Sequence, residues 1–161
     1  MILVDTGYLV AIAQPADALH LRAVSWAKMV SEPTLVTEHV LWETVNFLST
    51  PGDRPKVRCL IDHIQSATAF EIAFATCEMF EAGLGLHSQR SDKEWSLTDC
   101  ISFLIMQRRG IERALTYDHH FEQAGFEAPA AARPAVVRHE ARRECSSELS
   151  SVSCHQVGAG Y

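Results

Sequence analysis

The sequence lacks the features that mark membrane, secreted and disulfide-rich proteins. No hydrophobic run approaches the roughly 20 residues needed to span a bilayer, and no basic N-terminal stretch leads to a small-residue cleavage site. We therefore expect no membrane segment and no signal peptide. The five cysteines are odd in number and show no CxxC spacing, which argues against a disulfide framework. We expect a cytoplasmic protein with reduced, mostly buried thiols.

Positive charge is also scarce. The chain of 161 residues has a formal net charge of −6, and because residues 129–161 carry +1, residues 1–128 carry −7. An acidic body is a poor general binder of nucleic acid, since the phosphate backbone is itself negative. A nucleic-acid function would need a local basic patch, or metal ions that neutralise clustered acids. The 47% of hydrophobic residues is ordinary for a soluble domain with its own core.

Hydrophobic runs and turn signals alternate along the chain as βαβ units do. Strands are predicted at 2–5, 34–37, 70–74 and 114–116. Helices are predicted at 6–13, 17–31, 38–49, 55–67, 76–90, 97–109 and 119–124, and the helix at 17–31 has its apolar positions at Leu21, Val24, Trp26 and Met29. This order predicts an α/β fold, a three-layer α/β/α sandwich with a mostly parallel central sheet, over residues 1–128.

The composition changes after Glu127. Residues 129–161 are rich in Ala, Ser and Arg and contain few large apolar side chains, so we predict a disordered C-terminal tail. His139, Cys145, Cys154 and His155 are residue types that bind metals, but their spacing matches no zinc pattern. We therefore do not predict a zinc site in the tail.

Asp5 stands where the first strand gives way to a helix, in the stretch MILVDTGYLVAIA. Ligands of open α/β sheets bind at this carboxyl edge of the strands. Aspartate is also a favoured helix N-cap residue, so Asp5 by itself fits either role. Asp118 repeats the arrangement in RALTYDHHFEQAGF, where it ends a strand and opens a helix. Two strand-end acids on one edge of a parallel sheet should face the same crevice.

Two further acids lie on helices in largely apolar company. Glu43 occurs in TEHVLWETVNFLS and Asp99 in SLTDCISFLIMQ. A buried carboxylate without a partner is costly. Each residue could instead be a solvated or ion-paired acid at the edge of the apolar stripe, and Asp99 could be a first-turn acid that the helix dipole favours. If all four acids converge, they raise one another's pKa unless cations intervene. Such oxygen ligands suit Mg²⁺ or Mn²⁺.

The chain resembles the PIN domain family and, within it, the VapC-type toxin ribonucleases. The matching pieces are VDTG around Asp5, ETVNFL around Glu43, SLTDCISF around Asp99 and LTYDHHFEQAGF around Asp118. They occur in the family's order and spread over residues 2–127. Each piece alone is a lone acid in a hydrophobic setting, and the joint order carries the resemblance. The tail departs from the family, whose chains usually end soon after the last strand.

The resemblance implies a Mg²⁺-dependent endoribonuclease that also works with Mn²⁺ and that leaves 5′-phosphate and 3′-hydroxyl ends. It implies Asp5, Glu43, Asp99 and Asp118 as metal ligands and catalytic residues, and Thr116 as a supporting hydroxyl. Thr6 and Asn46 are further candidates for supporting roles. Asp92 and Glu94 could add charge to the rim, although a solvated loop is favoured. We interpret His119 and His120 as surface residues of a helix, because metal-activated water removes the need for a histidine base.

The resemblance also implies partners: an RNA substrate, a cognate antitoxin protein and a second copy of the chain in a homodimer. The basic residues that could hold an RNA backbone are Arg54, Lys56, Arg58, Arg108, Arg109 and Arg113, unless they only solubilise the surface. Two alternatives stay open. One is a solitary PIN nuclease that acts in RNA processing or on DNA flaps, and the other is an interaction module that has lost catalysis.

Overall fold

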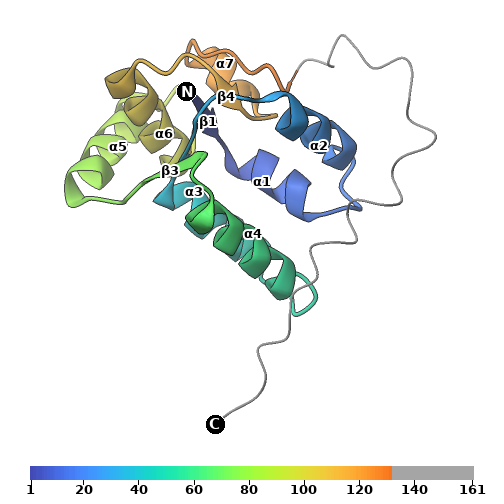
Figure 1. Cartoon of the computed structure of the whole chain (residues 1–161). Coiled ribbons are helices and arrows are strands. Elements are labelled where there is room, and N and C mark those ends of the chain that lie inside the picture. Colours follow the sequence, from blue (N-terminus) through green and yellow to red (C-terminus); the bar gives the residue numbers. More distant parts are fainter. Residues whose placement is uncertain (132–161) are drawn as a thin grey trace.

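The computed structural model describes residues 1–131, and its centre is a sheet of four strands (Figure 1). The strands are β1 (Ile2–Val4), β2 (Thr34–Thr37), β3 (Phe70–Ala73) and β4 (Ala114–Leu115), in the spatial order β3-β2-β1-β4. Leu3 of β1 is paired with Leu35 of β2 on one side and with Ala114 of β4 on the other. Every strand pair in the described residues is parallel, so the prediction of a mostly parallel sheet is confirmed.

Helices connect the strands in the order that the sequence predicts. Their observed ends differ from the predicted ends by at most three residues. The helices are α1 (Thr6–Ala13), α2 (His20–Met29), α3 (Glu38–Phe47), α4 (Arg54–Ser66), α5 (Cys77–Gln89), α6 (Leu97–Arg109) and α7 (His119–Gln123). The observed ends match the predicted ends at α1 and at α6, where Ser96 caps the start and Gly110 ends the helix with a left-handed φ of 63°.

Side chains alternate between the two faces of the sheet, as the strand pleat requires. Leu3 belongs to a buried cluster with Phe103 of α6, whereas Ile2 and Val4 belong to a second cluster with Leu9 of α1. Residues of α5, α6 and α7 complete the first cluster, and residues of α1 to α4 complete the second. Helices thus cover both faces of the sheet (Figure 1), which confirms the three-layer sandwich.

Gly83 allows α5 and α6 to pack closely. A Cβ atom at this position would lie 2.4 Å from Cγ1 of Ile101, a distance that real Cβ atoms do not tolerate. Gly85, two residues later, has no atom within 4 Å of its Cβ position. The first glycine is therefore required by the packing, and the second is not.

Two expectations about burial are wrong, and the strand predicted at 70–74 ends one residue early. Leu21, a predicted apolar position of α2, is 80% exposed, and Met29 is 48% exposed, because α2 packs on the core through Ala23 instead. Phe74 follows β3 and is 70% exposed. Of the cysteines at described positions, Cys100 is buried but Cys59 and Cys77 are exposed, so the thiols there are not mostly buried.

The packed part of the chain continues beyond the predicted boundary after residue 128. Ala130 is fully buried in the cluster that contains Ile2 and Val4. The carbonyl oxygen of Ala131 accepts a hydrogen bond from the guanidinium of Arg22. Residues 129–131 are thus ordered, contrary to the prediction for the tail, and the rest of that prediction lies outside the described residues. Within residues 1–131, no helix is both long enough and apolar enough to cross a membrane.

Candidate active site at the carboxyl edge of the sheet

Four carboxylates from four different segments line one cavity of about 570 Å³. Asp5 follows β1, Glu43 lies on α3, Asp99 lies in the first turn of α6, and Asp118 precedes α7. The parallel strands end at this edge, which is where α/β sheets place their ligands. The structure therefore brings together all four of the predicted acids.

Asp5 occupies the N-cap position of α1 but accepts no capping hydrogen bond with its side chain. Its Oδ2 instead accepts a hydrogen bond of 2.9 Å from Oγ1 of Thr116, which follows the neighbouring strand β4. The side chain is 6% exposed. Burial raises the pKa of Asp5 to about 7, and the charges of Asp99 and Glu43 add to that rise, while the hydrogen bond from Thr116 opposes it. The capping interpretation of Asp5 is therefore wrong.

Glu43 is held by a hydroxyl group from α1. Oγ1 of Thr6 donates a hydrogen bond of 2.5 Å to Oε2 of Glu43. Asn46, the other candidate for a supporting role on this side, is exposed and does not line the cavity. Phe47, one turn after Glu43, lines the cavity instead. The expectation for Asn46 is not met. Around the helix axis, the residues three and four positions after Glu43 point to opposite sides of the Glu43 side chain, and the cavity lies on the side of Phe47.

Asp99 serves the helix as well as the cavity. Its Oδ2 accepts a hydrogen bond of 2.8 Å from the amide of Ser96, and its own amide donates one of 3.0 Å to Oγ of Ser96, which together form a capping box. The residue is 8% exposed. Burial raises the pKa of Asp99, the bonds to Ser96 lower it, and the charge of Asp118 raises it further.

Asp118 and His120 form the other side of the cavity. Oδ1 of Asp118 accepts a hydrogen bond of 2.9 Å from the amide of His120, and the amide of Asp118 donates one of 2.9 Å to Oγ1 of Thr116. Nδ1 of His120 lies 3.1 Å from Oδ2 of Asp118 and 3.6 Å from Oδ2 of Asp99. The side chain of His120 is 14% exposed, so its interpretation as a surface residue is wrong; His119, at 68%, agrees with it.

The sequence did not identify His120 as a buried residue, because its two neighbours in the chain differ in exposure. It follows an exposed histidine and precedes Phe121, which is fully buried. A helix of five residues is too short for a periodic pattern to assign the direction of each side chain. The available signal was the N-cap role of Asp118, which brings the backbone amide of the second helical residue, His120, to the capping carboxylate.

The surroundings of the cavity fit a divalent cation. No Lys or Arg among the described residues lines it, so the buried carboxylate of Asp5 has no cationic side chain beside it there. No three of the four carboxylates at these positions have their oxygens all within 4.8 Å of one another, whereas Asp118, His119 and His120 do form such a group. Like charges keep the acids apart, and Mg²⁺ often bridges such gaps through water.

The charged residues around the cavity divide unevenly. Glu94 lines the cavity, whereas Asp92 is exposed and forms an ion pair with Arg90.

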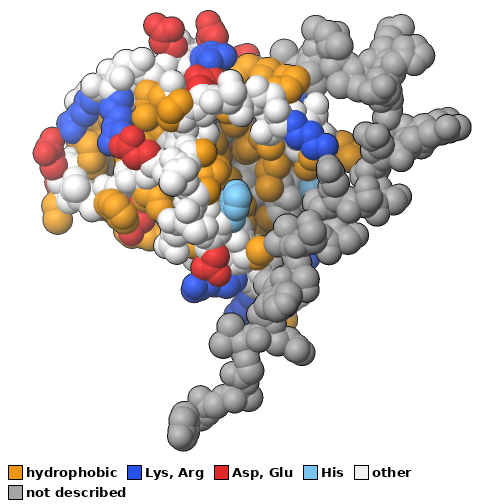
Figure 2. Space-filling view, viewed as in Figure 1, with side chains coloured by type: hydrophobic (Ala, Val, Ile, Leu, Met, Phe, Trp, Pro, Cys, Tyr) orange, Lys and Arg blue, Asp and Glu red, His pale blue; other side chains and the backbone are white. Residues whose placement is uncertain are grey.

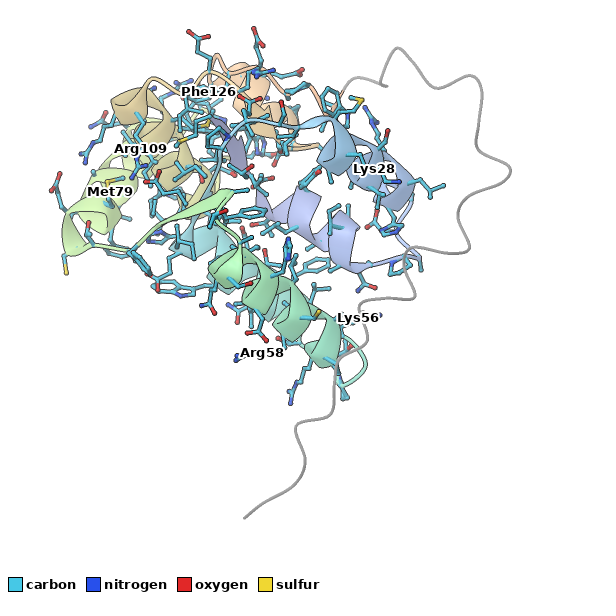
Figure 3. The ribbon with its side chains drawn as sticks, in the orientation of Figure 1. Lys28, Lys56, Arg58, Met79, Arg109 and Phe126 are labelled. Atoms are coloured by element: carbon cyan, nitrogen blue, oxygen red, sulfur yellow. The ribbon has the colours of Figure 1, made fainter. Side chains whose placement is uncertain are left out.

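None of the six basic residues that could hold RNA lines the cavity, and Figure 3 shows Lys56 and Arg58 on α4, far from Arg109 on α6. Five of the six are paired with carboxylates: Lys56, Arg58, Arg108, Arg109 and Arg113. Figure 2 shows such basic and acidic side chains lying side by side. The alternative of a solubilising surface fits these residues better.

Fold and site together define a class: α/β proteins with an acidic centre at the carboxyl edge of a parallel sheet. Residues 2–127 match the PIN domain, and the chain belongs to the PIN domain family. The resemblance stated from the sequence is thereby confirmed.

Known relatives agree with this assignment. The chain is 32% identical over 130 residues to the 23S rRNA-specific endonuclease VapC20 of Mycobacterium tuberculosis, an alignment that covers 78% of this chain and 95% of the relative. The crystal structure of VapC20, described as a sarcin-ricin loop cleaving toxin, matches with a TM-score of 0.75 and 25% identity over 83% of this chain and all of that one. FitAcB from Neisseria gonorrhoeae, at 18% identity and a TM-score of 0.58 over 80% of this chain and 95% of that one, shares the fold.

Proposed function

We propose that this protein is a divalent-metal-dependent endoribonuclease that hydrolyses RNA phosphodiester bonds, and that it is the toxin of a toxin–antitoxin pair. The convergence of Asp5, Glu43, Asp99 and Asp118 on one cavity is the observation that carries the proposal. Family membership and the endonuclease name of the VapC20 relative support the reaction class.

In the proposed site, Asp5, Glu43, Asp99 and Asp118 hold Mg²⁺, for which Mn²⁺ substitutes. Bound Mg²⁺ would lower the pKa of a water molecule that it binds, and it would offset the negative charge of the phosphate. The hydroxyls of Thr6 and Thr116 fix the orientation of the Glu43 and Asp5 carboxylates, to which they donate hydrogen bonds. Phosphodiester hydrolysis needs little covalent chemistry from the chain. The role of the four acids is to hold the ion in position.

The substrate class is structured RNA, and ribosomal RNA is the first candidate. The name of the VapC20 relative specifies 23S rRNA. The acidic body favours a substrate that is recognised by shape, because the described surface offers no basic groove beside the cavity. The substrate test is therefore the pattern of cleavage on total RNA, with the sites mapped by primer extension.

Protein partners belong to the proposal as well. The VapC20 relative is called a toxin, which supports a cognate antitoxin for this chain. Large apolar side chains are exposed on α3, after β3 and on α5: Trp42, Val45, Phe47, Phe74, Phe80 and Leu84. A contact with another chain would remove such apolar side chains from water. We assign these residues to a homodimer contact, which Trp42→Ser should weaken in sedimentation measurements.

The cleavage assay tests the central claim. Purified protein is incubated with ribosomal RNA in Mg²⁺, in Mn²⁺ and with excess chelator. Cleavage should require a divalent ion and should fall by orders of magnitude in Asp5→Asn and Glu43→Gln. Asp92→Asn is the matched control, because it neutralises a nearby acid that is outside the cavity and paired with Arg90. Cleavage that persists in chelator contradicts the proposal and leaves an interaction module as the alternative.

The toxin claim has a separate test in bacteria. Induced expression of the wild type should arrest growth and degrade RNA, and Asp5→Asn should do neither. Co-expression of a neighbouring gene for a small DNA-binding protein should restore growth if that protein is the antitoxin. A nuclease that is active in the tube and harmless in the cell favours a solitary role in RNA processing.

A further inference from the structure

His120 occupies a place in the cavity that its role in the fold does not explain. Its Nδ1 is buried and has no hydrogen-bond partner among the described residues, although Oδ2 of Asp118 lies 3.1 Å away. A buried polar atom without a partner is costly, and such an atom in a native structure calls for an explanation. A ligand in the cavity would provide one.

The backbone that carries the imidazole is held in place by three contacts. The amide of His120 is bonded to Oδ1 of Asp118, which leaves Oδ2 of that carboxylate facing the ring. Phe121 is fully buried and packs edge-to-face on Phe103 of α6, with ring centroids 4.9 Å apart. The amide of Asp118 is bonded to Thr116, whose hydroxyl is bonded to Asp5. The backbone at His120 is therefore linked to Asp118 directly and to Asp5 through Thr116.

The distance between His120 and Asp118 is that of neighbouring ligand atoms around one ion. Octahedral bonds of about 2.1 Å place neighbouring ligand atoms about 3 Å apart. Nδ1 of His120 lies 3.1 Å and 3.6 Å from the Oδ2 atoms of Asp118 and Asp99. In the described residues, the one group of at least three candidate ligands whose atoms lie within 4.8 Å of one another includes His120. His119 belongs to it too, but its side chain is 68% exposed and approaches Oδ1 of Asp118 from outside.

We propose that His120 is a direct nitrogen ligand of the divalent ion, beside Asp118, so that the site is not an all-oxygen centre. This inference rests on the proposed metal site. Neutral imidazole is the commonest protein ligand for transition metals, whereas Mg²⁺ prefers oxygen. A mixed nitrogen and oxygen set therefore shifts the preference of the site from Mg²⁺ toward Mn²⁺ and the transition metals that follow it in affinity.

Electron spin-echo spectroscopy of bound Mn²⁺ tests the assignment without an activity measurement. The full-length chain is loaded with Mn²⁺ at one fixed pH above the ordinary pKa of histidine. We expect modulation from a directly coordinated ¹⁴N nucleus, and its replacement by the ¹⁵N pattern when the histidines are ¹⁵N-labelled. The labelled wild type needs no substitution and so avoids any effect on folding.

Two variants identify the histidine. The nitrogen signal should disappear in His120→Asn, with Mn²⁺ affinity falling at least about tenfold and Mg²⁺ affinity falling by a smaller factor. His119→Asn, the matched control, should keep both the signal and the affinity. Circular dichroism melts confirm that both variants are folded.

The outcomes separate this inference from the proposed function. Mn²⁺ that binds without nitrogen coupling, or with coupling that survives His120→Asn, overturns the role of His120 and leaves the carboxylate site standing. Failure of the wild type to bind Mn²⁺, or binding that Asp5→Asn and Asp99→Asn leave unchanged, overturns the metal site itself.

Discussion

At the residue scale, Asp99 combines two functions that usually belong to different side chains. It completes the capping box of α6 and it faces Asp118 and His120 in the cavity. The two functions have different requirements, because a cap needs an oxygen acceptor and a metal ligand needs charge. Substitutions at this position can therefore separate the stability of the helix from the proposed chemistry.

Asp99→Asn should reduce RNA cleavage by orders of magnitude and leave stability in metal-free buffer equal or higher. The amide oxygen can still accept the bond from Ser96, and the repulsion by neighbouring acids is relieved. Asp99→Ala should lose the bond that the Ser96 amide donates, which is one half of the capping box, and should cost about 1 kcal/mol. Chemical denaturation and a cleavage assay of both variants provide the comparison. Full activity of Asp99→Asn would reduce the residue to a helix cap.

The buried carboxylate of Asp5 predicts the pH dependence of the metal-free protein. Its pKa rises from 3.8 to about 7 on folding because burial disfavours the charged form. Between these values the folded state binds more protons than the unfolded state, so the contribution of Asp5 to stability decreases as pH rises from about 4 to 7 and is constant above that. Chemical denaturation at several pH values in this range should show that the free energy of unfolding declines less with rising pH in Asp5→Asn than in the wild type. An identical profile for the two proteins would contradict this account.

At the scale of the elements, the contact between α5 and α6 depends on one glycine. Gly83→Ala should destabilise the protein by about 1–3 kcal/mol, because the new methyl group would overlap with Ile101. Gly85→Ala on the same helix should be neutral or stabilising by about 0.5–1 kcal/mol, since alanine has the higher helix propensity and space is open there. Thermal melts of the pair isolate the packing effect, and equal shifts would show that propensity alone matters.

The polar connections at the carboxyl edge also belong to this scale. Thr6 of α1 reaches Glu43 of α3, and Thr116 beyond β4 reaches Asp5 beyond β1. Each bond joins two segments that parallel pairing and helix packing bring to one edge. The acid cluster is consequently a product of the element arrangement, and no single segment contains it.

At the scale of the whole molecule, a divalent ion should stabilise the fold, since it binds the assembled acids and not the unfolded chain. Ion at ten times its Kd adds about 1.4 kcal/mol, which corresponds to a Tm rise of roughly 3–6 °C for a domain of this size. Melts with Mg²⁺ and Mn²⁺ measure it, and Asp5→Asn/Asp99→Asn should lose the shift. The same shift in that double mutant would place the ion elsewhere.

The end of the packed region defines the last prediction. A chain truncated after Ala131 should fold and cleave RNA like the full-length protein, because all four acids and the core precede that point. Truncation after Ala128 should cost about 1–3 kcal/mol, since it removes the buried Ala130 and the carbonyl to which Arg22 donates. Melting and cleavage of the two truncations compare them. Loss of activity in the longer one would show that residues 132–161 contribute to the reaction.

Local sequence determined much of the fold. Strand ends, caps and breakers act within a few residues, so Ser96 and Gly110 fix the ends of α6 and β1 is followed directly by α1. Local signals placed Asp5 and Asp118 at strand ends, but only the joint order of the four pieces, which resembles the PIN family, selected the four acids together. The direction of a side chain is different. Leu21 was expected to be buried and is exposed, and His120 was expected to be exposed and is largely buried. In a short helix, the neighbouring elements decide which face is buried.

Sequence by itself therefore determined the order of the elements, the parallel sheet and the identity of the candidate carboxylates. Only the tertiary structure decided which polar groups meet at the cavity. Thr116 lies 111 residues from Asp5 and Thr6 lies 37 from Glu43, and strand pairing and helix packing bring each pair together. The tertiary structure also decided that Asp5 is no helix cap and that His120 faces the acids. The physical reason is that local signals act along the chain, whereas a binding site is an arrangement in space of groups that the chain keeps apart.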